Sequence, residues 1–218
     1  MATRSENLPI SPKTVERLSI YRRALGRLPE ARGYIYSHEL ARLGGASADQ
    51  VRRDIMALGA AGSPSRGYHV ADLKAQIDRL FSDVSQHKVA LVGVGHLGES
   101  LIGYFDRRYD RLAIAALFDK DPEKTGRVIF GIRSYPMEEL ESVVLARGIT
   151  IAVLALPDAS SQEVAERLVA SGVTGILNFA PVSLHLPAGV RVEDVDIATA
   201  LDKLAFFARS GRSPEQER

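Results

Sequence analysis

The sequence contains no cysteine. This absence excludes disulfide bonds, zinc sites with thiolate ligands, iron–sulfur clusters and a cysteine nucleophile. No apolar run approaches the roughly 20 residues that a membrane-spanning helix needs, and residues 1–12 lack the apolar core of a secretory signal. We therefore expect a protein of the cytoplasm with no membrane partner. The five histidines are scattered without metal-ligand spacing, so no metal site is expected.

The formal net charge of +1 conceals an uneven distribution. Residues 1–80 hold 13 Lys and Arg against 8 Asp and Glu, whereas the rest of the chain holds 15 against 19. A basic half joined to an acidic half suggests two modules, the first of which could meet a polyanion. Charges scattered over a solvated surface would give the same counts, so the motifs must decide.

Residues 13–85 show three short helical patterns followed by a hairpin, which is the plan of a winged helix-turn-helix domain. An apolar stripe at helical spacing predicts the first helix from Thr14, and Ser37 is expected to cap the second. Ser47 and Gln50 form an S-x-x-Q capping box for the third. Residues 63–70 are typical of a hairpin tip, and residues 1–12 are expected to form a disordered arm.

The third helix is expected to read DNA bases in a major groove. Gln50 and Arg53 lie opposite its apolar stripe, with Arg52 on the flank, and arginine pairs well with guanine and glutamine with adenine. A helical module with solvated arginines is the alternative. The expected DNA contacts, to bases and phosphates together, are Arg17, Arg22, Ser47, Gln50, Arg52, Arg53, Arg66 and Tyr68.

Between residues 86 and 195, apolar runs of strand length alternate with helical patterns at residues 97–107, 137–147 and 162–171. This alternation predicts an α/β, Rossmann-type parallel sheet with helices on both faces. The first run leads into Gly93-Val-Gly95-His-Leu-Gly98. A G-x-G-x-x-G between a strand and a helix is the phosphate-binding turn of dinucleotide-binding sheets. The second strand ends at Asp119, where a carboxylate would bind ribose hydroxyls and repel a 2′-phosphate, favouring NAD(H) over NADP(H).

No proton donor for hydride transfer accompanies this predicted nucleotide site. The sequence has no Tyr-x-x-x-Lys pair, suggests no Ser/His/Asp set, and holds nothing that resembles a substrate domain. The site is therefore interpreted as a sensor rather than an enzyme. Two alternatives remain open: a small NAD-dependent oxidoreductase with an N-terminal partner-binding module, and a CoA-binding protein, which Asp119 disfavours.

From about residue 9 to 208 the chain resembles the Rex family of redox-sensing transcriptional repressors. The resemblance rests on QVRRD at residues 50–54, the glycine motif, and ILNFAP at 176–181, in combination. Ser19 and His96 stand where the family commonly has proline and asparagine. The wing, residues 62–68, has fewer glycines and basic residues than is usual in the family, which weakens the expectation that Arg66 contacts phosphates.

The resemblance implies a homodimer that binds an inverted-repeat operator and is released when NADH occupies the Rossmann domain. It also implies that a C-terminal helix, residues 196–209, is exchanged between subunits, and that residues 210–218 form a disordered tail. That helix is apolar nearly all round, so it must be buried, against a partner or in its own subunit. Asp196 is expected to pair with an arginine of the winged helix in one state. The expected NAD(H) contacts are Gly93, Val94, Gly95, His96, Leu97, Gly98, Asp119, Lys120, Tyr104, Pro157, Asn178, Phe179, Ala180 and Pro181.

Overall fold

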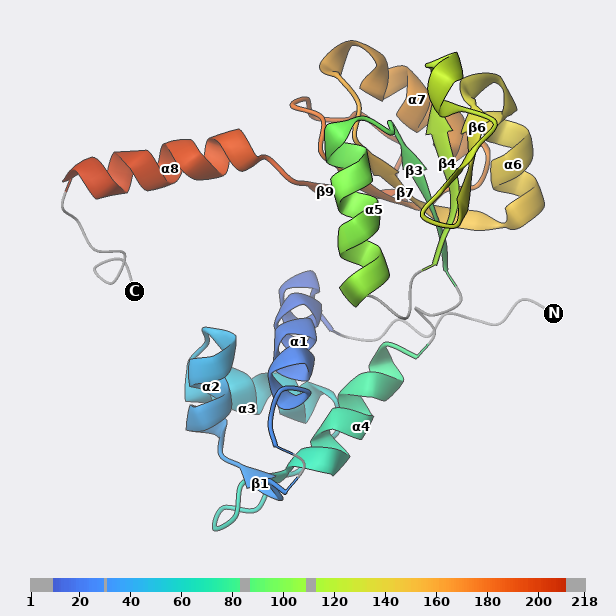
Figure 1. Cartoon of the computed structure of the whole chain (residues 1–218). Coiled ribbons are helices and arrows are strands. Elements are labelled where there is room, and N and C mark those ends of the chain that lie inside the picture. Colours follow the sequence, from blue (N-terminus) through green and yellow to red (C-terminus); the bar gives the residue numbers. More distant parts are fainter. Residues whose placement is uncertain (1–9, 30, 83–86, 109–112, 211–218) are drawn as a thin grey trace. The chain divides into compact units, whose positions relative to one another are not determined.

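The computed structural model describes residues 10–29, 31–82, 87–108 and 113–210 (Figure 1). The chain divides into two compact units, residues 1–83 and 84–218. Within the described ranges, none of the helices combines the length and apolar character needed to cross a bilayer. The predicted arm lies mostly outside the described residues, but Ser11 and Pro12 do not belong to an arm, because they are the cap and first residue of helix α1. The predicted tail lies outside the description from residue 211 onward.

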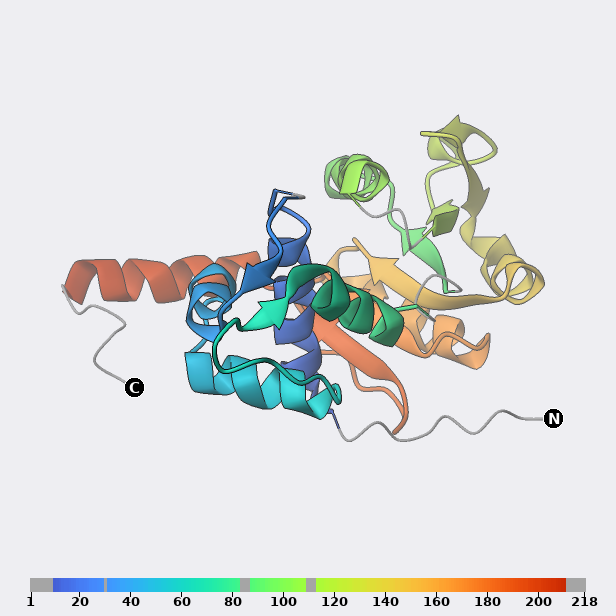
Figure 2. The same cartoon turned by 90° about the horizontal axis from the view of Figure 1, so that it is seen from below.

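The first unit is a winged helix-turn-helix domain, as the sequence predicts (Figures 1 and 2). Its elements are α1 (Pro12–Leu25), β1 (Tyr34–Ile35), α2 (Ser37–Gly44), α3 (Ala48–Ala57), β2 (Tyr68–His69) and α4 (Val70–Leu80). Leu18, Tyr21 and Leu25 form the buried face of α1, at the spacing of three and four residues that the apolar stripe requires. They pack in one core with side chains of α2, α3 and α4.

The helix caps agree with the sequence in one case and differ in the other. Ser47 caps α3, where its Oγ accepts a hydrogen bond from the Gln50 backbone N–H at 3.1 Å. The other half of the predicted capping box is not formed, because the Gln50 side chain bonds Asp54 and Arg53 instead of the Ser47 backbone. The cap of α2 is Tyr36 rather than Ser37, because the Glu39 carboxylate reaches back to the Tyr36 backbone N–H at 2.9 Å. The prediction that Ser37 caps α2 was therefore wrong by one residue.

The wing is built from two separate pairings. Ser63 and Gly67 exchange backbone hydrogen bonds of 2.8 and 2.7 Å that close its tip. Strand β2 then pairs antiparallel with β1, with Tyr34 opposite His69. The sequence did not predict β1, because a strand of two residues is too short to show an alternating pattern. The Tyr36 hydroxyl donates to the Ser65 carbonyl at 2.8 Å and so ties the wing to the start of α2.

The second unit contains a seven-stranded sheet in the order β5-β6-β4-β3-β7-β8-β9. Its elements are β3 (Lys88–Val92), α5 (His96–Arg108), β4 (Ala113–Asp119), the 3₁₀ turn η2 (Pro122–Lys124), β5 (Val128–Ile129), β6 (Ile132–Pro136), the 3₁₀ turn η3 (Met137–Glu139), α6 (Leu140–Arg147), β7 (Ile149–Leu154), α7 (Asp158–Ala170), β8 (Gly175–Asn178), β9 (Arg191–Asp194) and α8 (Ile197–Ser210). From β6 to β9 the strands are parallel and follow the order 3-2-1-4-5-6 of dinucleotide-binding sheets. The Rossmann-type fold is confirmed.

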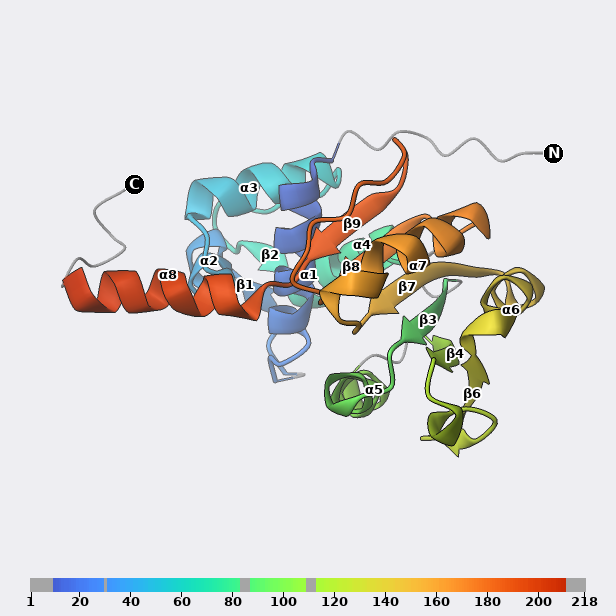
Figure 3. The same cartoon turned by 90° about the horizontal axis from the view of Figure 1, so that it is seen from above.

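The two faces of this sheet hold separate apolar cores. Helix α5 covers one face, and α6 and α7 cover the other (Figure 3). Ala90 and Val92 pack in the core that contains side chains of α6 and α7. Val89 and Leu91 pack in the other core, with Ile102 of α5. Because successive side chains of a strand point to opposite faces, β3 is buried on both sides. This explains why its sequence is a continuous apolar run.

Three details differ from the sequence-based expectation. Strand β5 pairs antiparallel with β6, so the sheet is not wholly parallel. Helix α7 begins at Asp158 rather than Gln162, since its polar first turn has no apolar periodicity to reveal it. The helix expected from Met137 to Arg147 is the short 3₁₀ turn η3 followed by α6.

Candidate functional site

The glycine turn lies where the two halves of the sheet diverge. Strands β3 and β7 are neighbours, and the chain leaves β3 for α5 on one face and β7 for α7 on the other. In such sheets ligands bind outside the carboxyl ends of the strands at this point. The turn is fixed to both neighbouring strands, because Gly93 N–H donates to the Phe118 carbonyl at 2.8 Å and Ala155 N–H donates to the Val92 carbonyl at 2.9 Å.

The three glycines of the motif have different surroundings. Gly93 has φ +96°, and a Cβ there would lie 2.4 Å from the Ala155 carbonyl oxygen. A Cβ on Gly98 would lie 2.0 Å from the Gly93 carbonyl oxygen, so only glycine lets α5 approach the turn this closely. At Gly95 no atom lies within 4 Å of the same position. The space over Gly95 and the N-terminus of α5 fit a pyrophosphate, since free N–H groups and the helix dipole favour anions there.

Asp119, the predicted ribose ligand, holds the glycine turn from beneath. Its side chain is only 8% exposed. Oδ2 accepts from the Val94 N–H at 2.7 Å and Oδ1 accepts from the Asp121 N–H at 2.9 Å. Lys120, the next residue, is exposed. The carboxylate therefore fixes the turn, a role that the sequence analysis missed, and its binding of ribose stays a prediction.

The predicted contacts after β8 form a compact turn. The Asn178 side chain is 1% exposed, and its Nδ2 donates to the Val182 carbonyl and to Asp194 Oδ1, both at 2.8 Å. Its Oδ1 accepts from the Ala180 N–H at 3.1 Å. Asn178 thus shapes the turn, while Phe179 is half-buried and Pro181 is exposed beside it.

The remaining predicted contacts lie on α5 and after β7. His96 and Leu97 are exposed in the first turn of α5, and Pro157 is exposed at the start of α7. Tyr104 is 44% exposed and packs edge-on against Phe105. At 1.5 Å per residue it lies roughly 12 Å along the helix axis from His96. Tyr104 therefore lies well away from the glycine turn along α5, and its contact with NAD(H) stays a prediction.

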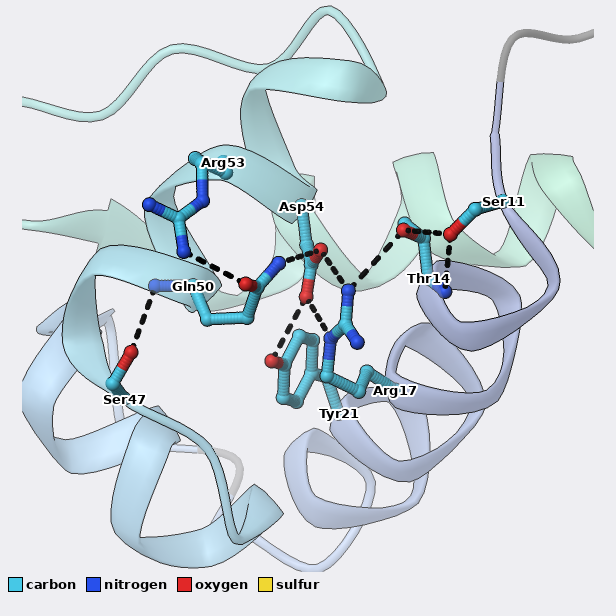
Figure 4. A network of polar contacts seen from close by, with 8 residues as sticks. All are labelled: Ser11, Thr14, Arg17, Tyr21, Ser47, Gln50, Arg53 and Asp54. Carbon is cyan, nitrogen blue, oxygen red and sulfur yellow. Dashed lines mark hydrogen bonds and ion pairs between the residues drawn. The ribbon is translucent and has the colours of Figure 1, made fainter. Parts of the chain in front are cut away.

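In the first unit, a buried carboxylate organises α3. Asp54 is 2% exposed and accepts from Arg17 Nε at 2.6 Å and Arg17 Nη2 at 2.7 Å (Figure 4). The Tyr21 hydroxyl donates to it at 3.1 Å. Burial acts to raise the pKa of Asp54, but the hydrogen bonds from Arg17, Gln50 and Tyr21 outweigh burial, and the pKa is lowered. Sequence spacing could not reveal this cluster, because Arg17 and Asp54 are 37 residues apart.

The arginines among the predicted DNA contacts differ in whether their guanidinium groups are already paired with a carboxylate. Arg17 is committed to Asp54, and Arg22 Nε pairs with Asp78 at 2.7 Å, so both guanidiniums already have a carboxylate partner. The exposed Arg52 pairs with Asp49 and donates to Ser37 Oγ at 3.0 Å. Arg53, exposed on α3, donates from Nη2 to Gln50 Oε1 at 2.8 Å, and Gln50 Nε2 donates to Asp54 Oδ1 at 2.8 Å.

The wing adds a hollow beside α3. It is lined by residues of the α2 start, of α3 and of the wing: Tyr36, Ser37, Arg52, Gly62, Ser63, Pro64, Gly67 and Tyr68. Burial raises the pKa of the Tyr68 hydroxyl. Arg66 at the wing tip is exposed, and Ser47 is exposed at the start of α3. Of the predicted DNA contacts, Arg52 of α3 and Tyr68 of β2 line this hollow.

Asp196 is the N-terminal neighbour of α8. Its carboxylate accepts from the Thr199 N–H at 2.8 Å and from the Thr199 hydroxyl at 2.5 Å. These hydrogen bonds hold the pKa of Asp196 below its ordinary value. In this structure the residue caps a helix, and its pairing with an arginine stays a prediction.

Comparisons with protein families divide the chain in a similar way. A family model described as "CoA binding domain" matches residues 84–182. A second model, described as "Putative DNA-binding protein N-terminus", matches residues 9–55.

Relatives and solved structures match nearly the whole chain. The redox-sensing transcriptional repressor Rex of Streptomyces coelicolor is 40% identical over 94% of this chain and 79% of its own length. The protein of the same name from Lactobacillus acidophilus is 36% identical over 94% of this chain and 98% of its own length. Crystal structures of RSP, with β-NAD⁺ and operator DNA or with β-NADH, share 27% and 26% of residues with this chain. Their TM-scores are 0.85 and 0.81, and each covers 93% of this chain and 94% and 96%, respectively, of its own.

The open Gly95 and the crowded Gly98 predict different effects of an alanine substitution. Gly98→Ala should destabilise the second unit by about 1–3 kcal/mol, because its Cβ would overlap the Gly93 carbonyl. Gly95→Ala should leave the thermal midpoint unchanged yet lower NADH affinity at least about tenfold, which is about 1.4 kcal/mol. Thermal unfolding and NADH fluorescence titration measure the two effects. Wild-type NADH affinity in Gly95→Ala would contradict the assigned phosphate position.

The buried phenol of Tyr21 predicts a loss of stability at alkaline pH. Burial, followed by the charge of Asp54, raises the pKa of Tyr21 from 10.0 to about 12. Between pH 10 and 12 an unfolded tyrosine loses its proton while Tyr21 keeps it, so its contribution to stability falls as the pH rises. The stability difference between wild type and Tyr21→Phe should therefore decrease by up to about 2–3 kcal/mol over this range.

Urea denaturation at pH 9 to 12 measures this difference, and comparing the two proteins cancels the titration of lysines. Tyr34→Phe is the control, since Tyr34 is 45% exposed. Parallel pH profiles for wild type and Tyr21→Phe would show that the phenol is not held protonated.

Proposed function

The chain belongs to the Rex family of redox-sensing transcriptional repressors, and from this membership we propose that it represses transcription in the cytoplasm according to the NADH/NAD⁺ ratio. It binds an inverted-repeat operator as a homodimer through the winged helix-turn-helix domain. Binding of NADH to the Rossmann-type unit releases the DNA. The RSP structures, with NAD⁺ and operator DNA in one and NADH in another, support both ligands for a chain of this fold.

The observation that carries the proposal is the glycine turn. It combines open space over Gly95, the N-terminus of α5 and the buried Asp119 beneath, which together suit a dinucleotide pyrophosphate. We assign the phosphates to residues 93–98 and the nicotinamide side to Pro157 and residues 178–181. NAD⁺ and NADH differ by one charge on the ring, so apolar groups such as Phe179 favour the neutral, reduced form.

Dimer formation is supported by the exposed apolar surface of α8. Ile197, Leu201 and Leu204 are 57%, 60% and 64% exposed. The described residues of the same chain leave this helix uncovered, which argues against the alternative that it is buried in its own subunit. A helix that is apolar nearly all round needs a partner, and exchange of α8 between two subunits supplies one. The two subunits then place two α3 helices on one operator, about one helical turn (~34 Å) apart.

CoA is a second candidate ligand, because the matching family model carries that description. A free ribose diol near Asp119 suits NAD(H) better than the 3′-phosphorylated ribose of CoA, since a carboxylate repels phosphate. The oxidoreductase alternative loses support, because the relatives named above are repressors.

A fluorescence-anisotropy titration of an inverted-repeat duplex tests the function. NADH added at fixed salt should release the duplex, whereas NAD⁺ should release less at equal occupancy. Arg53→Ala should weaken binding to the preferred duplex by about 1–3 kcal/mol and leave NADH affinity unchanged. A dimer saturated with NADH that keeps its duplex would refute the proposed regulation.

Assembly through α8 gives a separate prediction. Leu201→Asp should shift the chain from dimer to monomer, because a buried carboxylate without donors is costly at an interface. Light scattering after size exclusion measures the mass. Asp202→Asn, on the same helix, is the control and should stay dimeric. A dimeric Leu201→Asp variant would show that α8 is not the interface.

A further inference from the structure

A continuous path of hydrogen bonds runs from the core of the first unit to the exposed face of α3 (Figure 4). Arg17 and Tyr21 of α1 hold the buried Asp54 carboxylate. Asp54 accepts from the Gln50 amide nitrogen, and the Gln50 amide oxygen accepts from Arg53, both at 2.8 Å. The Asp54 carboxylate is buried and is bonded by both Arg17 and Tyr21, so its position is fixed by the core. The orientation of Gln50, and through it of Arg53, follows from that position.

This path leaves little freedom to the Gln50 amide. Its nitrogen faces a carboxylate, and its oxygen faces a guanidinium, so both ends make charge-assisted hydrogen bonds. A glutamine that reads adenine uses the same nitrogen as donor and the same oxygen as acceptor. Gln50 would have to share or give up both partners to do so. The expectation from sequence that Gln50 reads adenine is therefore not what this geometry favours.

Arg53 has the complementary property. It is exposed, and among the described contacts only its Nη2 is bonded within the chain. The bond to Gln50 uses one of the two Nη2 hydrogens. The second Nη2 hydrogen, together with the donor beside it on the same edge of the planar group (Nη1 or Nε), stays available for the N7 and O6 acceptors of guanine. An exposed arginine normally loses conformational entropy when it binds. The bond to Gln50 already restricts the Arg53 side chain before binding, so the entropy cost of binding is smaller.

Arg52 provides a contrast on the same helix. Its guanidinium bonds Asp49 and Ser37, lies beside the wing hollow and takes no part in the path from Asp54. Two neighbouring arginines of α3 are thus held by separate sets of partners. Changing Gln50 should affect one of them and not the other.

We propose that Gln50 is a positioning residue, which orients Arg53 for base reading while the Arg17–Asp54 pair and Tyr21 fix Gln50 from beneath. The inference rests on the proposed function, in which α3 enters the major groove. It assigns direct base contact to Arg53 and denies it to Gln50.

A double-mutant cycle on the full-length chain tests this assignment. Duplexes are selected with the wild type from a pool with randomised inverted repeats, and affinities are then measured for the selected duplex and its single base-pair substitutions. Gln50→Met keeps the length of the side chain and removes the amide. It should lower selectivity about tenfold at the same base pairs as Arg53→Ala, and the double variant should lose no more than Arg53→Ala alone.

The matched control is the pair Gln50→Met and Arg52→Ala, whose effects should add. NADH affinity should stay at the wild-type value in all five variants. Gln50→Met removes one donor to Asp54 but leaves Arg17 and Tyr21 in place, so each variant should still unfold in one cooperative transition above the assay temperature, which separates positioning from folding. Additive losses for Gln50 and Arg53, a changed preference at a base pair that Arg53→Ala leaves untouched, or a loss equal for all duplexes would each overturn the proposal.

Failure of the proposed function gives a different result. A wild-type chain that selects no duplex, or an Arg53→Ala variant with undiminished selectivity, would remove base reading by α3 itself. The relation between Gln50 and Arg53 is decided only by the cycle, so the two outcomes are distinguishable.

Discussion

A carboxylate that is removed from water must be surrounded by hydrogen-bond donors, and each unit places such a carboxylate beneath the segment that we propose meets its ligand. Asp54 gathers donors from α1 and α3 under α3, the helix proposed to read DNA. Asp119 gathers two backbone N–H groups under the glycine turn. In both places the cost of burial is offset only when the segment has one particular geometry, so the buried charge selects the shape of the site.

The sequence predicted those parts of the molecule whose signals are local. The strand–glycine–helix motif, the apolar strands and the Ser47 cap each occupy a short window with strong periodicity or fixed spacing. Strand β1, the β5–β6 hairpin and the polar first turn of α7 have no such periodicity, and they were missed. The Asp54 cluster and the hydrogen bond from the Val94 N–H to Asp119 were also missed, because these partners are distant in sequence and are brought together only by folding.

Helix α8 connects stability with assembly. Its exposed leucines and isoleucine are a liability for a single chain, and under the proposed exchange they form the interface between two chains. A repressor that must hold two reading helices at a fixed separation gains from this arrangement. Under the proposed exchange, a single chain exposes the apolar surface of α8 that the dimer covers. The dimer is then both the more stable species and the species that binds DNA.

The buried Asn178 has a mechanical consequence. Its amide bonds Val182 in the turn after β8 and Asp194 at the end of β9, and α8 begins at Ile197, three residues later. The turn assigned to the nicotinamide and the segment that leads into α8 are therefore both hydrogen-bonded to the Asn178 side chain. A small tilt at the N-terminus of α8 becomes a larger displacement at its C-terminus, because the helix is 14 residues long and acts as a lever.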